Sequence, residues 1–184
     1  MPFRPAPRAP QSSSPVGAMP SLYTPEQRAR RDATRWTLVQ GVLAPLQFVV
    51  FAVSAVLVLR VLATGQGLFA AQLSFVVKTA LLYTIMVTGS VWEKRVFGQW
   101  LFAPAFFWED VFSMLVIALH TAYLVALVTG WLGTREQLLL ALAAYFTYVV
   151  NALQFFLKLR AARRQGSSGP AAMLDAATPL ATGK

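Results

Sequence analysis

The chain has 184 residues, of which 57% are hydrophobic and 12% are charged, and this balance excludes an ordinary soluble domain. The lack of cysteine and the single histidine exclude disulfides, iron–sulfur clusters, thiolate zinc sites and multi-histidine metal sites. The net charge of +9 is concentrated in the two tails and one loop, which indicates membrane topology, and we expect no nucleic-acid partner.

The first segment predicts a disordered tail followed by a surface helix. Residues 1–20 are rich in Pro, Ser and Ala and contain no apolar run, so they bury too little surface to offset the entropy of ordering. Thr24 precedes Pro25, and Gln27 follows at the third helical position, which is the pattern of a capping box. We therefore predict a short, basic, amphipathic surface helix within residues 21–35.

Four long apolar stretches come next, and each has the roughly 20 residues that a membrane span requires. They cover residues 36–62, 68–91, 111–131 and 137–159. Lipid offers no partner to backbone amides, so we predict an all-α, polytopic membrane protein with a four-transmembrane-helix bundle over 36–160. Short loops at 63–67 and 132–136 make two antiparallel hairpins. Residues 161–184 are linker-like, and we expect a second disordered tail there.

The distribution of basic residues predicts the orientation of the bundle. Most of them flank the first span, the C-terminal end of the fourth span and the start of the aromatic loop 92–108, whereas the opposite side of the membrane offers only Arg60 and Arg135. By the positive-inside rule, both termini and the long loop are cytoplasmic.

Ionisable side chains within or at the edge of a span are costly, and they are the first candidates for function. They are Lys78, Glu93, Glu109, Asp110 and His120. Each helix also has one polar seam at helical spacing. The seam of the second span is Thr79, Tyr83, Met86, Ser90 and Glu93, and that of the third is Glu109, Ser113, Val116, His120 and Tyr123.

Structural roles are the alternative for these residues. Ser, Thr and Gln in the seams are best explained as helix-packing residues. His120 as a packing histidine, and Glu109 with Asp110 as a helix cap, remain open alternatives to a functional role. Lys78 has an otherwise apolar stripe around it, so it must pair with a carboxylate, face water or be neutral.

Five strings resemble the 3-vinyl (bacterio)chlorophyllide hydratase family of bacteriochlorophyll biosynthesis. They are LYTPEQ at 22–27, WTLVQGVLAP at 36–45, LYTIMVTGSVWEK at 82–94, FAPAFFWED at 102–110 and ALHTAY at 118–123. The resemblance covers residues 21–160. It carries over no catalytic motif residue by residue, so the assignment of site residues rests on chemistry.

The resemblance implies a hydro-lyase that adds water to the C3-vinyl group of chlorophyllide a or bacteriochlorophyllide and gives the 3-(1-hydroxyethyl) derivative. It implies no cofactor, and a location in the bacterial inner, intracytoplasmic photosynthetic membrane. Neighbouring enzymes of pigment biosynthesis are candidate partners, and the oligomeric state is left open. The main alternative is a non-catalytic pigment-binding or assembly subunit of a photosynthetic complex. A small ion or proton-coupled transporter ranks last, because the spans lack duplicated, interrupted helices.

Hydration of an alkene needs a proton for the terminal carbon, a stabilised cation, and water oriented by a second group. We predict Glu109, Asp110 and His120 as catalytic residues, with one acid donating the proton. His120 is predicted either to orient the water or to be the axial ligand of the substrate magnesium, and the protein itself binds no metal. His120 lies about 16 Å deeper than Glu109, so the two flank one molecule of porphyrin size. The predicted substrate-binding residues are Lys78, Tyr83, Glu93, Trp108 and Tyr123.

Overall fold

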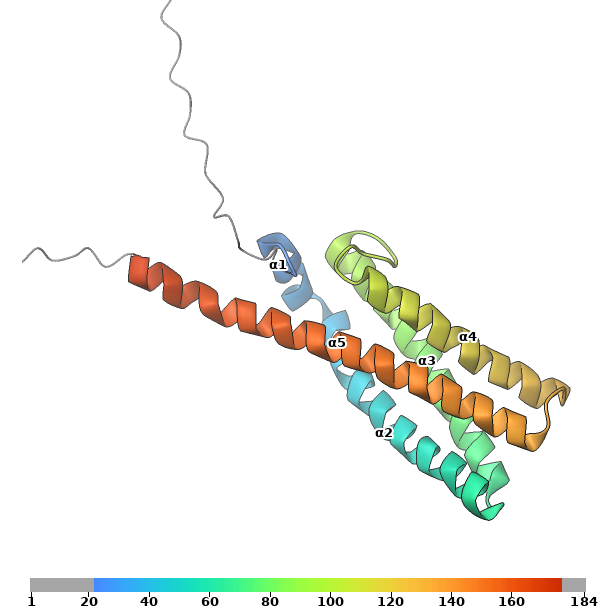
Figure 1. Ribbon diagram of the computed structural model, residues 1–184. Helices are drawn as coiled ribbons and strands as arrows, with labels where there is room; N and C mark the ends of the chain where they lie inside the picture. The colour runs from blue at the N-terminus through green and yellow to red at the C-terminus, as the bar shows by residue number, and fades with distance from the viewer. Residues whose placement is uncertain (1–21, 177–184) are drawn as a thin grey trace, which may run out of the picture.

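The computed structural model describes residues 22–176, with side chains described only for 22–161, and it contains five helices and no strand in that range (Figure 1). They are α1 (Pro25–Ala33), α2 (Arg35–Thr64), α3 (Leu68–Phe97), α4 (Phe107–Thr129) and α5 (Thr134–Ala176). Helices α2, α3, α4 and the Thr134–Ala161 part of α5 are long and apolar enough to cross a membrane. The predicted all-α fold with four helices of membrane-spanning length and composition is therefore confirmed for the described residues.

The structure describes part of one predicted tail and none of the other. Residues 1–20 and 177–184 lie outside the described residues. Within 161–176, which the sequence assigned to a disordered tail, α5 continues as a helix, and this part of the prediction needs correction. Residues 161–165 are Ala, Arg and Gln, which are good helix formers, whereas nothing in the Gly- and Pro-containing residues 166–170 predicts a helix.

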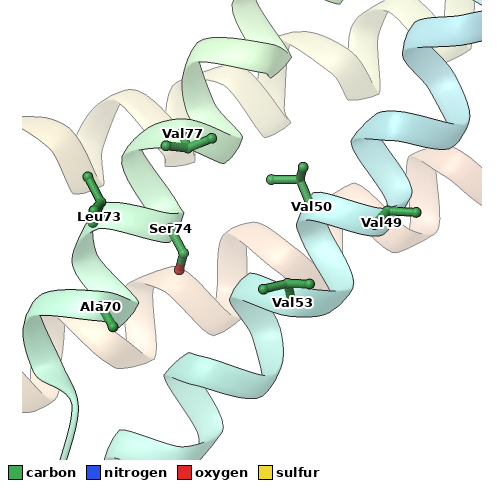
Figure 2. Close-up of a pocket in the computed structure, with 7 residues that line it drawn as sticks. All are labelled: Val49, Val50, Val53, Ala70, Leu73, Ser74 and Val77. Carbon is green, nitrogen blue, oxygen red and sulfur yellow. The ribbon is translucent and has the colours of Figure 1, made fainter.

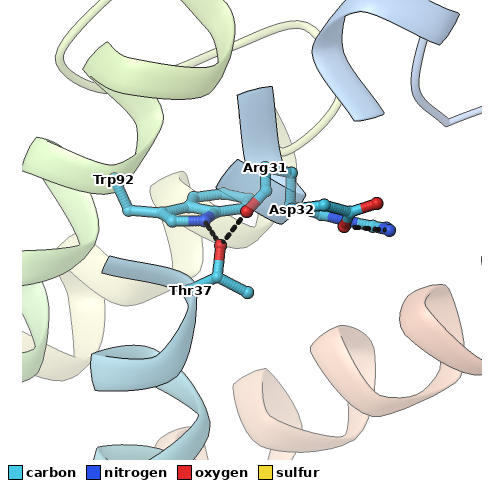
Figure 3. A network of polar contacts seen from close by, with 4 residues as sticks. All are labelled: Arg31, Asp32, Thr37 and Trp92. Carbon is cyan, nitrogen blue, oxygen red and sulfur yellow. Dashed lines mark hydrogen bonds and ion pairs between the residues drawn. The ribbon is translucent and has the colours of Figure 1, made fainter. Parts of the chain in front are cut away.

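Helix α1 begins at the predicted capping box. The side chain of Thr24 accepts a hydrogen bond from the backbone N–H of Gln27 at 3.2 Å, and the side chain of Gln27 accepts one from the N–H of Thr24 at 2.9 Å. Thr37 of α2 then donates to the carbonyl of Arg31 at 2.6 Å and accepts from the Trp92 indole N–H at 3.0 Å (Figure 3). This contact ties the surface helix to the end of α3.

Helices α2 and α3 form one antiparallel hairpin, and α4 and α5 form the other. Gly65 ends α2 with φ +70° and Gly67 precedes α3 with φ +85°, conformations that glycine adopts without strain. The packing is close within each hairpin and sparser between them. The long loop between α3 and α4 lies at the same end of the bundle as α1 (Figure 1).

The interior of the bundle contains more aromatic and polar side chains than an ordinary apolar core. The ring of Phe75 stacks on Tyr123 at 3.8 Å and on His120 at 5.0 Å between ring centroids. The hydroxyl of Ser54 on α2 hydrogen-bonds Ser74 on α3 and Tyr145 on α5, and so links the two hairpins. Polar side chains of the interior therefore hold the bundle together as well as offering candidate sites.

Candidate functional site

Three carboxyl groups and one lysine gather at the long-loop end of the bundle, and we call them the acid cluster. Glu93 comes from the last turns of α3, Glu109 and Asp110 come from the first turn of α4, and Lys158 comes from α5. Glu93, Glu109 and Asp110 are all buried, with 6%, 7% and 3% of their surface exposed. Three buried acids in one place require specific partners, because an unpaired charge away from water is costly.

Glu109 has a cationic partner. The Nζ atom of Lys158 lies 2.6 Å from Glu109 Oε2 and 5.1 Å from the centroid of the Phe106 ring. An ammonium–carboxylate contact of this length is a charge-assisted hydrogen bond. The structure thus gives Glu109 the geometry of a carboxylate.

The carboxyl groups of Glu93 and Asp110 form a pair within the acid cluster. Their side chains are neighbours, and two buried carboxyl groups that share a site hold a proton between them rather than carry two like charges. Backbone donors of the loop fix both groups: Phe102 N–H donates to Asp110 Oδ2 at 2.7 Å, and Ala103 N–H donates to Glu93 Oε2 at 3.3 Å. The pair therefore contains one carboxylic acid in a fixed orientation.

The loop that supplies these donors has an unusual backbone. Among the described residues Phe102 is the only non-glycine residue with a positive φ, at +59°. Such a conformation costs on the order of 1–3 kcal/mol and persists only where the surroundings impose it. Here the hydrogen bond to Asp110 is one such restraint.

An aromatic cap covers the acid cluster, and it consists of Tyr23, Trp92, Phe97, Phe106 and Phe155. The Phe106 ring is 2% exposed and its centroid lies within 5.8 Å of those of Trp92, Phe97 and Phe155. Tyr23 stacks on Phe97 at 5.8 Å, and burial raises the pKa of its phenol above 10.0. The cap lies next to the acid cluster through the contact between Phe106 and Lys158, and the three carboxyl groups of that cluster are buried.

A second group, the mid-membrane cluster, consists of Lys78, His120, Tyr123 and Tyr148. The ammonium of Lys78 lies 3.8 Å from the centroid of the Tyr148 ring, and His120 Nδ1 is 2.8 Å from the carbonyl oxygen of Val116. Since a carbonyl only accepts, Nδ1 carries the proton and Nε2 has a free lone pair. Lys78 Nζ, His120 Nε2 and the Tyr123 hydroxyl are buried without a hydrogen-bond partner.

The two clusters are separate. His120 follows Asp110 by ten residues along α4, which is about 15 Å at 1.5 Å per residue. Between them, Asn151 donates to the Ser113 hydroxyl at 2.8 Å. The Oδ1 atom of Asn151 and the side-chain amide of Gln47 are buried and unpaired. A polar path therefore runs from one cluster toward the other.

Two predicted site residues lie apart from these clusters. Trp108 is 67% exposed and packs edge-on against Phe107, so it faces outward from the first turn of α4. Tyr83 is half-buried, and its hydroxyl hydrogen-bonds Thr121 at 2.8 Å. Asn151 and Lys158 were not among the predicted site residues, and the loop N–H donors have no sequence signal at all.

Two cavities among the described residues are lined by no predicted site residue. One is a groove of about 380 Å³ between α2 and α3, where Val50 and Val53 lie opposite Leu73, Ser74 and Val77 (Figure 2). The other, of about 290 Å³, lies among the two short turns near Gly65 and Arg135. The first groove is almost wholly apolar, as expected of a surface that faces lipid chains.

Comparison with known proteins gives a consistent result. A family model described as 2-vinyl bacteriochlorophyllide hydratase matches residues 23–161. A relative from Cereibacter sphaeroides with that name is 69% identical over 153 residues, which cover 83% of this chain and 95% of the relative. One from Rhodobacter capsulatus, with the same name, is 63% identical over 168 residues, covering 91% and 95%. No solved structure matches.

Proposed function

The chain belongs to the 2-vinyl bacteriochlorophyllide hydratase family, and we propose that it adds water to the vinyl group of chlorophyllide a or bacteriochlorophyllide. The product carries a 1-hydroxyethyl group. The observation that supports this chemistry best is the buried pair of neighbouring carboxyl groups, Glu93 and Asp110, which loop N–H donors hold in place. Hydration needs such a group, because an alkene attached to the macrocycle must be protonated before water can add.

The Glu93–Asp110 pair is the proton donor and the proton acceptor of the reaction. It gives its proton to the terminal vinyl carbon, and the cation that forms on the inner carbon is delocalised into the macrocycle. Water then bonds to this carbon and returns one proton to the pair. Atoms and charges balance over the cycle, so the scheme needs neither a cofactor nor an oxidant.

This assignment changes the role expected of Glu109. A carboxylate already paired with Lys158 at 2.6 Å is a poor proton donor, whereas Asp110 shares a proton with Glu93. We assign Glu109 to holding α4 and α5 together next to the reacting acids, and we move Glu93 from substrate binding to catalysis.

His120 is assigned to the magnesium of the substrate. It lies about 15 Å from Asp110 along α4, deeper in the bundle than the acids that we assign to proton transfer. Its Nε2 lone pair is free and its Nδ1 proton is held by Val116. A neutral imidazole fixed in this tautomer is a suitable axial ligand.

The proposal extends to location. The protein lies in the inner, intracytoplasmic photosynthetic membrane with both termini and the acid cluster on the cytoplasmic side. The basic residues of α1 and of the ends of α3 and α5 support this orientation. Tetrapyrrole substrate would then reach the aromatic cap from the cytoplasm, and neighbouring biosynthetic enzymes remain proposed partners.

The test uses the full chain purified into lipid nanodiscs and supplied with chlorophyllide in isotopically labelled water. The expected product has gained one water molecule and carries the label on the new hydroxyl. Glu136→Gln, which alters an exposed acid at the opposite end of the bundle, is the matched control for Glu93→Gln. Tight retention of unchanged pigment by the wild-type protein would instead support the pigment-binding subunit.

A further inference from the structure

Lys78 is a cation without a protein counter-ion. Its side chain is fully buried, and its Nζ atom has no hydrogen-bond partner. Among the described residues, the ion pairs are Arg31–Asp32 and Lys158–Glu109, so no carboxylate of this part of the chain pairs with Lys78. The Tyr148 ring offsets only part of the cost of burying an ammonium within a span.

The neighbours of Lys78 are also unpaired. Phe75, one turn earlier on α3, stacks on both His120 and Tyr123. The Nε2 atom of His120 and the hydroxyl of Tyr123 lack hydrogen-bond partners, and both side chains are fully buried. Buried polar atoms are rarely left unpaired, and several of them on facing helices indicate a site that takes a polar ligand group.

The substrate class offers a group of the required charge. A chlorophyllide is the phytyl-free, unesterified acid, so it carries a carboxylate on the side chain that is an ester in the finished pigment. The vinyl group and this side chain are on different rings of the macrocycle. The Lys78 ammonium lies over the ring of Tyr148, which precedes Lys158 of the acid cluster by ten residues, or about 15 Å, along α5. Acids at one end of the bundle and a free cation deeper in it match these two groups in one elongated molecule.

We propose that Lys78 binds the free carboxylate of the substrate and so selects the unesterified pigment over its esters. This inference rests on the proposed hydratase function. A substrate carboxylate at this position explains why a lysine lies in the otherwise apolar stripe of α3. It also sets the orientation of the substrate, with the carboxylate near Lys78, the magnesium near His120 and the vinyl group near Asp110.

The test compares the free acid with its methyl ester as ligands, since the ester differs only in the charge that Lys78 would recognise. Pigment binding is measured by absorbance titration, separately from turnover, for the wild type, Lys78→Met and Lys94→Met. Lys94 is the matched control, because it is a lysine of the same helix whose ammonium donates to the carbonyl of Gly98 at 2.8 Å.

The wild type and Lys94→Met should bind the acid at least about tenfold more tightly than the ester, the scale of one charge-assisted hydrogen bond. Lys78→Met should lose this preference by binding the acid more weakly and the ester as before. Equal binding of acid and ester by the wild type would overturn the inference, even if Lys78→Met does not fold. Equal weakening of both ligands in Lys78→Met would also overturn it. Selective binding without hydration would overturn the proposed function alone.

Discussion

Replacing Asp110 with Asn tests the proton donor with little change in shape. The amide oxygen of Asn can still accept the hydrogen bond from Phe102 N–H, which is 2.7 Å long in the wild type, so the loop should keep its conformation. An amide cannot release a proton, however, and Glu93 alone cannot form the shared-proton pair. We expect binding of pigment to persist while the chemical step slows.

The size of the effect follows from what a positioned acid contributes. General acid catalysis contributes roughly 100- to 10,000-fold, so kcat should fall by that factor, equivalent to about 3–5 kcal/mol in the barrier. Glu93→Gln should behave in the same way, because either substitution leaves the pair without a transferable proton.

Initial rates of the vinyl-to-hydroxyethyl conversion, followed by absorbance in nanodiscs, measure kcat, and a pigment titration measures binding. Glu136→Gln should retain wild-type values for both. The reasoning is refuted if Asp110→Asn keeps kcat within about threefold of the wild type, which is far less than a general acid supplies. It is refuted as well if pigment binding falls as much as kcat, since that would make Asp110 a binding residue.

Four other predictions concern the Glu109–Lys158 ion pair, the role of His120, the anchor of α1 and the orientation in the membrane. Glu109→Gln and Lys158→Met should each lower the free energy of unfolding by about 1–3 kcal/mol, because each substitution leaves the other group of the ion pair without its partner. A double-mutant cycle should find the two substitutions coupled. Additive losses would contradict the ion pair. His120→Ala should weaken binding of chlorophyllide at least about tenfold but leave binding of the magnesium-free analogue unchanged, and an equal effect on both would exclude the axial-ligand role. Trp92→Phe removes the indole N–H that donates to Thr37, the residue that binds the carbonyl of Arg31 on α1. This should lower the free energy of unfolding by about 1 kcal/mol and speed proteolysis within α1. Unchanged proteolysis would mean that α1 is anchored elsewhere. An alkaline phosphatase inserted at residues 65–67 should be active and one fused to the C-terminus inactive, whereas the reverse result would contradict the proposed orientation.

The sequence predicted the elements of this fold well because each rests on a local property. Hydrophobic length located the four spans, and the capping residues located the start of α1. Helical spacing predicted the polar seam of α4, and all its members, Glu109, Ser113, Val116, His120 and Tyr123, are buried. The hydratase family was also recognised from the strings of residues and is confirmed by the relatives.

Partners within the site could not be predicted, because they depend on how the hairpins pack. Nothing in the sequence relates Glu93 to Asp110 or Glu109 to Lys158, which come together from different helices. The loop donors depend on the positive φ of Phe102, an unusual conformation for a non-glycine residue. Trp108 was included for its ring alone, and helix geometry turns it outward, away from the acids beside it.

The charges of the acid cluster fit the reaction that we propose. The Lys158 cation cancels the Glu109 carboxylate, so the net charge of the cluster is the single negative charge of the Glu93–Asp110 pair. When the pair gives up its proton, its charge becomes −2 at the moment when the substrate becomes a cation beside it. Opposite charges attract more strongly where the aromatic cap keeps water out. The acid pair would therefore stabilise the cation that it creates, and an unpaired Glu109 would have made the first proton harder to release.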